Sequence, residues 1–325
     1  MRFSRLGIFV LLIFAVFLST NCSYYNKVMS RKNLVDGSLA YKERKFDVAE
    51  ELFRKAAARD QEGATVEGRT AQIFLARTLH SRYIGNRGDK SLADQAITEY
   101  KKALSVDNND QSSYKAIAGL YENLQKPDEW QQWVTERSNN GGIKPEFRAE
   151  ALTSLAAKQN TCANEVTDTS ETKKTIKKDG KDVFQFLKPA NPQDFERLKV
   201  CVAEGAKFID QAVALEPAEV KNASAGDVST LTDEQLKTKL DTVKPFESAR
   251  SYKASLLIQG ARLAEMEGRT ADKDKLKADG DKAKADFVVL SDVTKALQSE
   301  IDKRTAIKAE DANKDKDKSN NATKK

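Results

Sequence analysis

Residues 37–60 read GSLAYKERKFDVAEELFRKAAARD, and this stretch decides the fold. Ala49, Phe53 and Ala56 are four and three residues apart, so they share one face of a helix. The small side chains let a preceding helix approach closely, and Phe53 fills the space that remains. The polar residues 43–45 then predict a turn between this helix and a partner helix at about residues 33–42.

The same spacing of small and large residues returns twice along the chain. It recurs at Ala96, Tyr100 and Ala103, and again, with glycine in the first position, at Gly205, Ile209 and Ala212. These residues resemble the tetratricopeptide repeat (TPR), a helix–turn–helix unit of 34 residues. The resemblance implies an all-α, TPR-like solenoid. An amphipathic helical bundle packed with Ala and Phe is the alternative interpretation.

The resemblance also implies how the chain is divided. Three repeats cover residues 30–144, and Ile84–Lys90 lengthens the turn of the second. A split fourth repeat occupies residues 145–219, with helices at 145–158 and 194–215. A polar insertion at 220–247, with a short helix from the Thr232 cap to Leu240, precedes C-terminal helices and a weak fifth repeat at 248–301. Residues 302–325 become too polar to offset the entropy of ordering, which predicts a disordered tail.

The insertion at about residues 160–192 differs in character from the helices. Residues 174–186 read KTIKKDGKDVFQF, with β-branched and aromatic residues on both sides of Asp179-Gly180. Asp-Gly supplies the positive φ angles of a two-residue turn, so we expect a short β-hairpin. Cys162 precedes it and Cys201 follows it, and in an oxidising compartment they are candidates for one disulfide. Two separate buried thiols are the alternative.

The first residues indicate the compartment. Arg2 and Arg5 form a positively charged segment before the apolar run 6–18. The 13 residues of this run are too few to cross about 30 Å of hydrocarbon. We therefore expect a secretory signal at residues 1–21. Cys22, placed directly after it, resembles the lipidated cysteine of a bacterial lipoprotein, followed by a tether at 22–29. An ordinary cleaved signal and an uncleaved anchor are alternatives. Ser23 follows Cys22, and no Asp stands there to signal inner-membrane retention, which favours the outer membrane, facing the periplasm.

Composition argues against catalysis and against nucleic acid. Charged residues make up 32% and hydrophobic residues 39%, and one His and three Cys leave little material for a metal centre or a Cys–His nucleophile. The chain contains no phosphate-loop, dinucleotide-binding, nucleophile-elbow or zinc-protease motif. Removing residues 1–21 lowers the net charge from +6 to +4, and Lys and Glu are interleaved. We expect no enzyme, catalytic residue, cofactor, metal site or nucleic-acid partner.

The function class that remains is the binding of a peptide or protein partner. The concave groove of the family is lined by the first helix of each repeat and binds peptides or proteins. The resemblance places these side chains in that groove: Leu34, Ser38, Tyr41, Ile73, Arg77, His80, Lys115, Gly119, Glu122 and Asn123.

At class level the resemblance implies an envelope scaffold of the kind that serves outer-membrane assembly, secretion or pilus biogenesis. The alternative is an accessory or solute-binding subunit of an envelope enzyme or transporter, with the repeats as a frame and a pocket near the hairpin.

Overall fold

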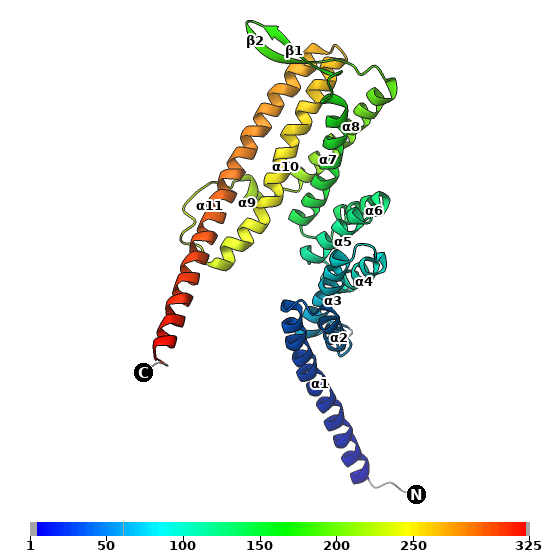
Figure 1. Ribbon diagram of the computed structural model, residues 1–325, viewed down its shortest axis with the longest axis vertical. Helices are drawn as coiled ribbons and strands as arrows, with labels where there is room; N and C mark the ends of the chain where they lie inside the picture. Colours follow the sequence, from blue (N-terminus) through cyan, green and yellow to red (C-terminus); the bar gives the residue numbers. More distant parts are fainter. Residues whose placement is uncertain (1–4, 61, 323–325) are drawn as a thin grey trace. The chain divides into compact units, whose positions relative to one another are not determined.

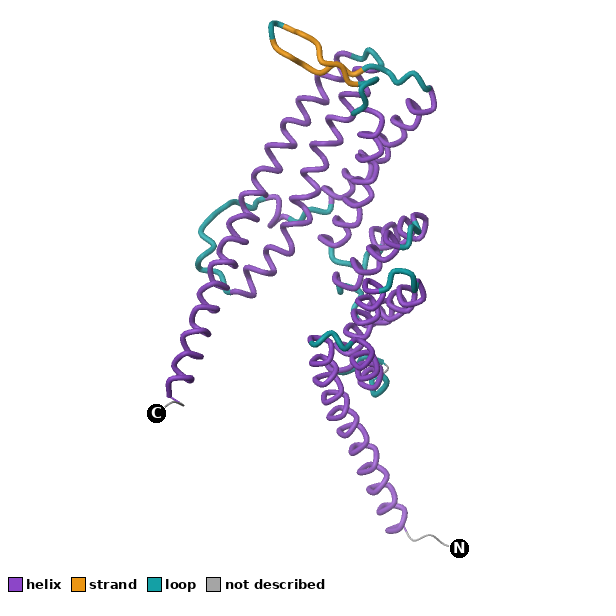
Figure 2. Tube along the Cα trace, viewed as in Figure 1, coloured by secondary structure: helices purple, strands orange, loops and turns teal. Residues whose placement is uncertain are grey.

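The computed structural model describes the backbone of residues 5–60 and 62–322, and the side chains of residues 24–60 and 62–311. Within these residues the regular secondary structure is helical apart from one two-stranded antiparallel sheet (Figures 1 and 2). It divides into two compact units, Met1–Trp130 (unit 1) and Gln131–Lys325 (unit 2), which we describe separately. The predicted all-α fold with TPR-like helix pairs and a β-hairpin insertion is confirmed.

Unit 1 is a row of antiparallel helix pairs. Its helices are α1 (Arg5–Lys42), α2 (Phe46–Ala57), α3 (Val66–Gly85), α4 (Lys90–Val106), α5 (Gln111–Asn123) and the start of α6 (Pro127–Asn139). From α1 to α5 each helix packs against the next along the chain, and α1 also contacts α3. Short turns and contacts between successive helices are the arrangement expected of stacked helix–turn–helix repeats.

The α1–α2 pair has the packing that its sequence predicts. Phe53 is fully buried, and a Cβ atom placed on Gly37 of α1 would lie 2.8 Å from its ring. The same ring stacks on Phe74 of α3, with 5.4 Å between centroids. Arg44 adopts a φ angle of 60°, which closes the turn between α1 and α2. Phe53 therefore holds three helices together, and glycine at position 37 is what allows α1 to reach it.

The second helix pair differs from the expectation in one detail. The stretch Ile84–Lys90 was expected to lengthen the turn, but α3 continues to Gly85 and only residues 86–89 separate it from α4. Tyr83 is buried in the last turn of α3, and Asp89 caps α4 by accepting a hydrogen bond from the Ser91 amide at 3.1 Å. Because Tyr83 is buried and Asp89 caps α4, Ile84 and Gly85 belong to α3 and Lys90 belongs to α4.

Unit 2 is built around helix α10 (Asp233–Met266), which contacts several other helices of the unit. Its helices are α7 (Pro145–Thr167), α8 (Pro192–Ala214), α9 (Ala218–Lys221), α10 (Asp233–Met266) and α11 (Thr270–Ala322). Figure 1 shows α10 and α11 running side by side, and α10 also contacts α7 and α8. The core between them contains the fully buried side chains Ile209, Leu236, Phe246, Leu290 and Leu297. The two halves of the predicted split repeat, α7 and α8, pack against each other, and α7 extends beyond its expected end to Thr167.

The predicted polar insertion at 220–247 is wrong in its second half. Thr232 does cap a helix: its hydroxyl accepts from the Gln235 amide at 3.2 Å, and the Gln235 side chain accepts from the Thr232 amide at 2.8 Å. The helix does not end at Leu240, however, but continues through Pro245 to Met266. Proline costs a helix one hydrogen bond. Burial of Phe246 and the residues around it offsets that loss.

The expected boundary of the tail at residue 302 is too early. α11 continues past it, and Arg304 donates to the Leu231 carbonyl at 2.8 Å and pairs with Asp233 at 3.0 Å. Lys308 pairs with the same carboxylate. These contacts fix the part of α11 that sequence composition alone marks as unstructured.

The β-hairpin lies between α7 and α8. Strand β1 (Lys173–Lys178) pairs with β2 (Lys181–Phe186), and the turn residues Asp179 and Gly180 have φ angles of 50° and 74°. The predicted disulfide between Cys162 and Cys201 is present and joins α7 to α8, with 6.1 Å between the Cα atoms. At the base of the hairpin Phe186 packs against the cluster that contains this bridge.

The sequence predictions for the N-terminus concern a signal at residues 1–21 and lipid attachment at Cys22. The side chains of the expected signal, residues 1–21, and of Cys22 lie outside the described residues. In the part of the chain that is described, no helix has an apolar stretch of the length needed to cross a membrane.

Replacing Gly37 by Val should destabilise unit 1 by about 2–3 kcal/mol, because the new side chain overlaps the ring of Phe53. Gly119→Val in α5 is the matched control, since a Cβ there meets no atom within 4 Å. It should change stability by no more than about 0.5 kcal/mol. Urea unfolding followed by circular dichroism measures both, and equal stabilities of the two variants would contradict the close packing of α1 on Phe53.

Reducing the Cys162–Cys201 bridge should destabilise unit 2 by about 4 kcal/mol, the entropy expected for opening a loop with a sequence separation of 39 residues. The variant Cys162→Ser/Cys201→Ser should lose the same amount and no longer respond to reductant. The unit 1 transition serves as the internal control. An unfolding curve of the native chain that does not move on reduction would show that the bridge contributes nothing.

Candidate functional site

Five side chains from three helices of unit 1 form a connected surface that we call the first-helix face: Tyr41, Phe74, Arg77, Ser81 and Ser112. Tyr41 of α1 hydrogen-bonds the Ser81 hydroxyl of α3 at 2.9 Å. Its ring also meets Phe74 of α3 edge-on, with 6.1 Å between centroids. Because Phe74 stacks on the buried Phe53, this partly exposed face rests directly on the core of unit 1. The first-helix face is therefore rigid as well as accessible.

Arg77 is the charged group of the first-helix face. Its guanidinium lies over the Phe74 ring, 5.5 Å from the centroid, and donates to the Ser112 hydroxyl of α5 at 3.3 Å. Among the described residues no carboxylate forms an ion pair with Arg77, whereas Arg82, little more than one turn later, pairs with Asp47 and Glu50 of α2. A cation that is held in place by a ring and a hydroxyl, and that lacks a counter-ion, is suited to a carboxylate of a ligand.

Ile73 lines a cavity of about 510 Å³ next to this face, together with residues of the α2–α3 loop and the ends of α4 and α5. Asp60 orders the loop: its carboxylate accepts from the amides of Ala64 and Thr65 at 2.9 and 2.7 Å. Burial raises the pKa of Asp60, but the hydrogen bonds from Thr65 and Ala64 and the charge of Arg69 outweigh it, so the net pKa lies below its usual value. Asp60 is therefore ionised near pH 7, and its carboxylate holds the Ala64–Thr65 end of the loop in place.

His80, the single histidine, is half-buried behind the face. Its Nδ1 atom lies 3.5 Å from the Tyr100 hydroxyl, and the two rings meet edge-on. Burial lowers the pKa of His80, and the positive charge of Arg87 lowers it further. Burial also raises the pKa of Tyr100. Both groups are therefore neutral near pH 7, and they serve as packing and hydrogen-bonding groups rather than as charges.

The other expected groove residues are not gathered in one place. Leu34 packs against Ala56, Ala57 and Ala71 of the core. The Ser38 hydroxyl donates to the Leu34 carbonyl of its own helix at 2.7 Å. Asn123 accepts from Arg87 at 3.2 Å. Three residues of α5 lie on its solvent-accessible side: Lys115, Gly119 and Glu122.

Sequence reasoning missed Phe74, Ser81 and Ser112. Phe74 precedes Arg77 by three residues on α3, which is the spacing at which helix side chains meet. That spacing was a readable signal. No sequence pattern marks Ser81 or Ser112, because their role depends on how α3 lies against α1 and α5.

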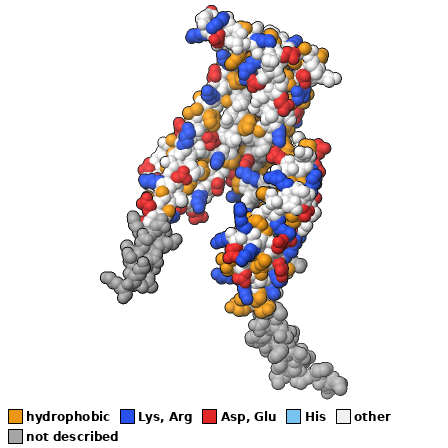
Figure 3. All heavy atoms as spheres, viewed as in Figure 1, with side chains coloured by type: hydrophobic (Ala, Val, Ile, Leu, Met, Phe, Trp, Pro, Cys, Tyr) orange, Lys and Arg blue, Asp and Glu red, His pale blue; other side chains and the backbone are white. Residues whose placement is uncertain are grey.

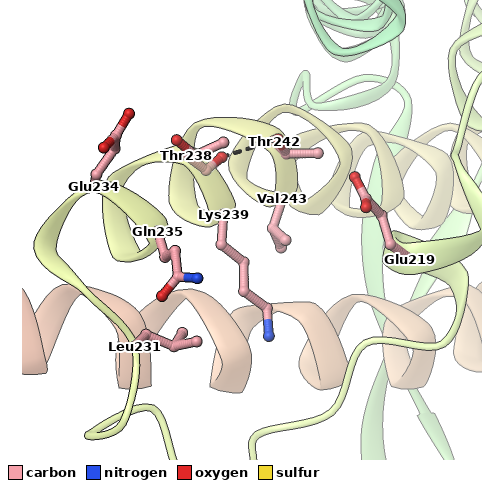
Figure 4. A pocket seen from close by; sticks show the side chains of 8 residues that line it. All are labelled: Glu219, Leu231, Glu234, Gln235, Thr238, Lys239, Thr242 and Val243. Atoms are coloured by element: carbon pink, nitrogen blue, oxygen red, sulfur yellow. Dashed lines mark hydrogen bonds between the residues drawn. The ribbon is translucent and has the colours of Figure 1, made fainter.

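A second cavity of about 510 Å³ lies in unit 2 beside the first turns of α10 (Figure 4). Lys239 extends toward α11, whereas Glu234 points away from it. The Thr242 hydroxyl donates to the Thr238 carbonyl at 2.9 Å, and Gln235 is used in the helix cap. Two of its polar groups are thus engaged by their own helix, so the lining does not converge on a ligand.

The surroundings of the disulfide, where the solute-binding alternative placed its pocket, hold one perturbed carboxylate. The hydrogen bond from Lys173 is the main reason that the pKa of Asp168 lies below its usual value, and Arg262 contributes to the same effect. Asp168 is therefore one partner in a surface ion-pair cluster. Across the described residues no group of three or more His, Cys, Asp or Glu side chains is arranged to hold a metal ion.

No family model matches the chain, and no curated protein matches it. Among solved structures the chain is similar to pilF of Pseudomonas aeruginosa, with 15% identity over 78% of this chain and 90% of that one and a TM-score of 0.31. A TM-score this low means that the two backbones superimpose poorly.

The pKa of His80 makes stability depend on pH. Above about pH 6.5 the imidazole is neutral in both the folded and the unfolded chain. As the pH falls through 6.5 the unfolded chain takes up a proton that folded His80 resists, so stability should fall until the folded ring is itself protonated.

The single imidazole signal in an NMR titration should accordingly have a midpoint below about 6.5. His80→Gln, which keeps a polar group that does not titrate, should remove this part of the pH dependence from urea unfolding. A midpoint at or above 6.5 would disprove the proposed effect of burial.

Proposed function

We propose that this chain is a non-enzymatic scaffold that binds protein or peptide segments on the first-helix face of unit 1. The observation that carries the proposal is Arg77, a guanidinium fixed over Phe74 and hydrogen-bonded to Ser112, with no carboxylate partner among the described residues. Tyr41, which packs on Phe74, and Ile84, which is 53% exposed and lies seven residues after Arg77 on the same row of α3, add apolar surface near it.

This arrangement defines the chemistry of the ligand. A carboxylate, from Asp, Glu or a chain terminus, accepts hydrogen bonds from Arg77, and a neighbouring apolar side chain packs on Tyr41 and Phe74. Arginine and tyrosine are, with tryptophan, the residues that most often dominate the energy of protein interfaces. An extended segment fits a row of stacked helix pairs, because each pair offers the next contact along the row.

The place of action is also part of the proposal. The apolar run 6–18 and Cys22 support export and lipid attachment, so the scaffold would stand in a bacterial envelope, tethered to a membrane and facing the periplasm, with the outer membrane favoured. Assembly, secretion or pilus biogenesis at that membrane are the processes in which such a scaffold would serve.

The binding face is tested by photo-crosslinking in the producing bacterium. Benzoylphenylalanine at position 84, on the row of α3 that contains Arg77, should give a discrete adduct with another protein. The same group at position 51 of α2, whose Glu pairs with Lys55 of its own helix, is the control and should give none. Adducts of equal yield at both positions would reject the first-helix face as the binding surface.

Substitution of Arg77 then tests the role of the cation. Arg77→Ala should lower the adduct yield from position 84 by about 10-fold or more, the effect of losing one buried charge-assisted contact. Lys55→Ala, which removes an exposed cation from α2, should leave the yield unchanged. An undiminished adduct in correctly folded Arg77→Ala protein would overturn this assignment.

Intact mass of the protein from membrane fractions tests the tether. A chain that begins at Cys22 and carries a diacyl- or triacylglyceryl group is the expected result. An unmodified species that begins after residue 21 would leave a diffusible binding protein in place of an anchored one.

A further inference from the structure

The two faces of the hairpin carry different side chains. Cross-strand pairing places Lys174 opposite Gln185, Ile176 opposite Val183 and Lys178 opposite Lys181, and these six residues form what we call the lysine face. Ile176 and Val183 at its centre are 37% and 36% exposed. Figure 3 shows blue basic side chains gathered around the hairpin, at the end of unit 2 where α10 and α11 meet (Figure 1). An apolar pair is thus surrounded by three ammonium groups.

The charges of the opposite face are neutralised within the chain, whereas those of the lysine face are not. On the opposite face Lys177 pairs with Asp182 at 2.8 Å, and Lys173 pairs with Asp168 at 2.7 Å while it lies over the Phe184 ring. Phe186 on that face lies against the guanidinium of Arg262.

On the lysine face the ammonium of Lys174 donates to the Ser170 carbonyl at 2.7 Å. No lysine of that face forms an ion pair with a carboxylate of the described residues. Three lysines that form no ion pair in the described part of the chain therefore surround the apolar pair.

The chemistry of the lysine face fits an anionic bilayer better than a protein. Protein interfaces are depleted in lysine and rely on arginine and aromatic residues, and the lysine face contains neither. Two apolar side chains are also too few for the area that a stable protein interface buries. At a bilayer surface, in contrast, lysine stems lie along the acyl boundary while their ammonium groups reach the phosphates, and each contributes independently.

We propose that the lysine face of the β1–β2 hairpin docks on the surface of a membrane that contains anionic phospholipid. Ile176 and Val183 contact the interface, and Lys174, Lys178 and Lys181 bind headgroup phosphates. Each lysine strengthens the contact by roughly 5-fold at low ionic strength. The contact belongs to unit 2 and does not depend on the first-helix face or on a lipid at Cys22.

The test uses the full chain. Its readout is a crosslink at one chosen residue, so membrane attachment through the N-terminus does not affect the comparison. Benzoylphenylalanine is placed at position 176 on the lysine face, or at position 175 on the opposite face as the matched control. The protein is incubated with vesicles of phosphatidylglycerol and phosphatidylcholine in about a 1:3 ratio, or of phosphatidylcholine alone, and illuminated. Mass spectrometry then counts the lipid adducts.

The expected result is a lipid adduct at position 176 that exceeds the one at 175 several-fold, requires phosphatidylglycerol and declines as salt is raised. Lys178→Gln/Lys181→Gln should lower its yield by about 5- to 30-fold. Lys177→Gln, which removes a charge already paired with Asp182, should leave the yield unchanged. Equal adducts at 175 and 176, or no lipid adduct at 176, would each overturn the proposal.

Discussion

The contact between the backbone of α1 at Gly37 and the ring of Phe53 sets the geometry of unit 1. A side chain at position 37 would occupy the space of the ring, so glycine fixes how closely α1 and α2 approach. Phe53 passes this constraint to α3 through its stacking on Phe74. Since Phe74 also carries Tyr41 on its edge and Arg77 on its face, the position of the candidate binding groups follows from one close contact in the core.

In unit 2 the corresponding role belongs to α10, which contacts α7, α8 and α11. Gly205 of α8 lies so near Leu256 of α10 that a Cβ atom would come within 2.6 Å of its side chain. The same device, a small residue facing a large one, therefore recurs with a different pair of helices. A bidentate ion pair between Arg250 and the buried Glu216 holds the segment after α8 to α10. The disulfide closes the other end, where the hairpin begins.

Local patterns in the sequence were sufficient for much of this fold. The Ala49–Phe53–Ala56 spacing, the Asp179-Gly180 turn and the Thr232 capping box each depend on residues a few positions apart, and each was predicted. The errors arose where distant residues decide the outcome. Pro245 is accommodated because Phe246 beside it is buried among other helices, and residues beyond 302 stay helical because Arg304 reaches Asp233. The candidate site divides in the same way, since Arg77 follows from its position in the repeat, while Ser81 and Ser112 become part of the site only through packing.

The contacts of Arg304 have a consequence for the order in which unit 2 forms. The turn that contains Gly268 joins α10 to α11 over a few residues, so pairing of these helices can start there at little entropic cost and spread outward. Arg304 hydrogen-bonds Leu231 and Ser229 at sequence separations of 73 and 75 residues, at the far end of the pair. We expect those bonds to form after the two helices have paired and to open first when the helices separate. The loop before α10 and the part of α11 that contains Arg304 should therefore open before the end of the pair near Gly268, and amide exchange should be faster there.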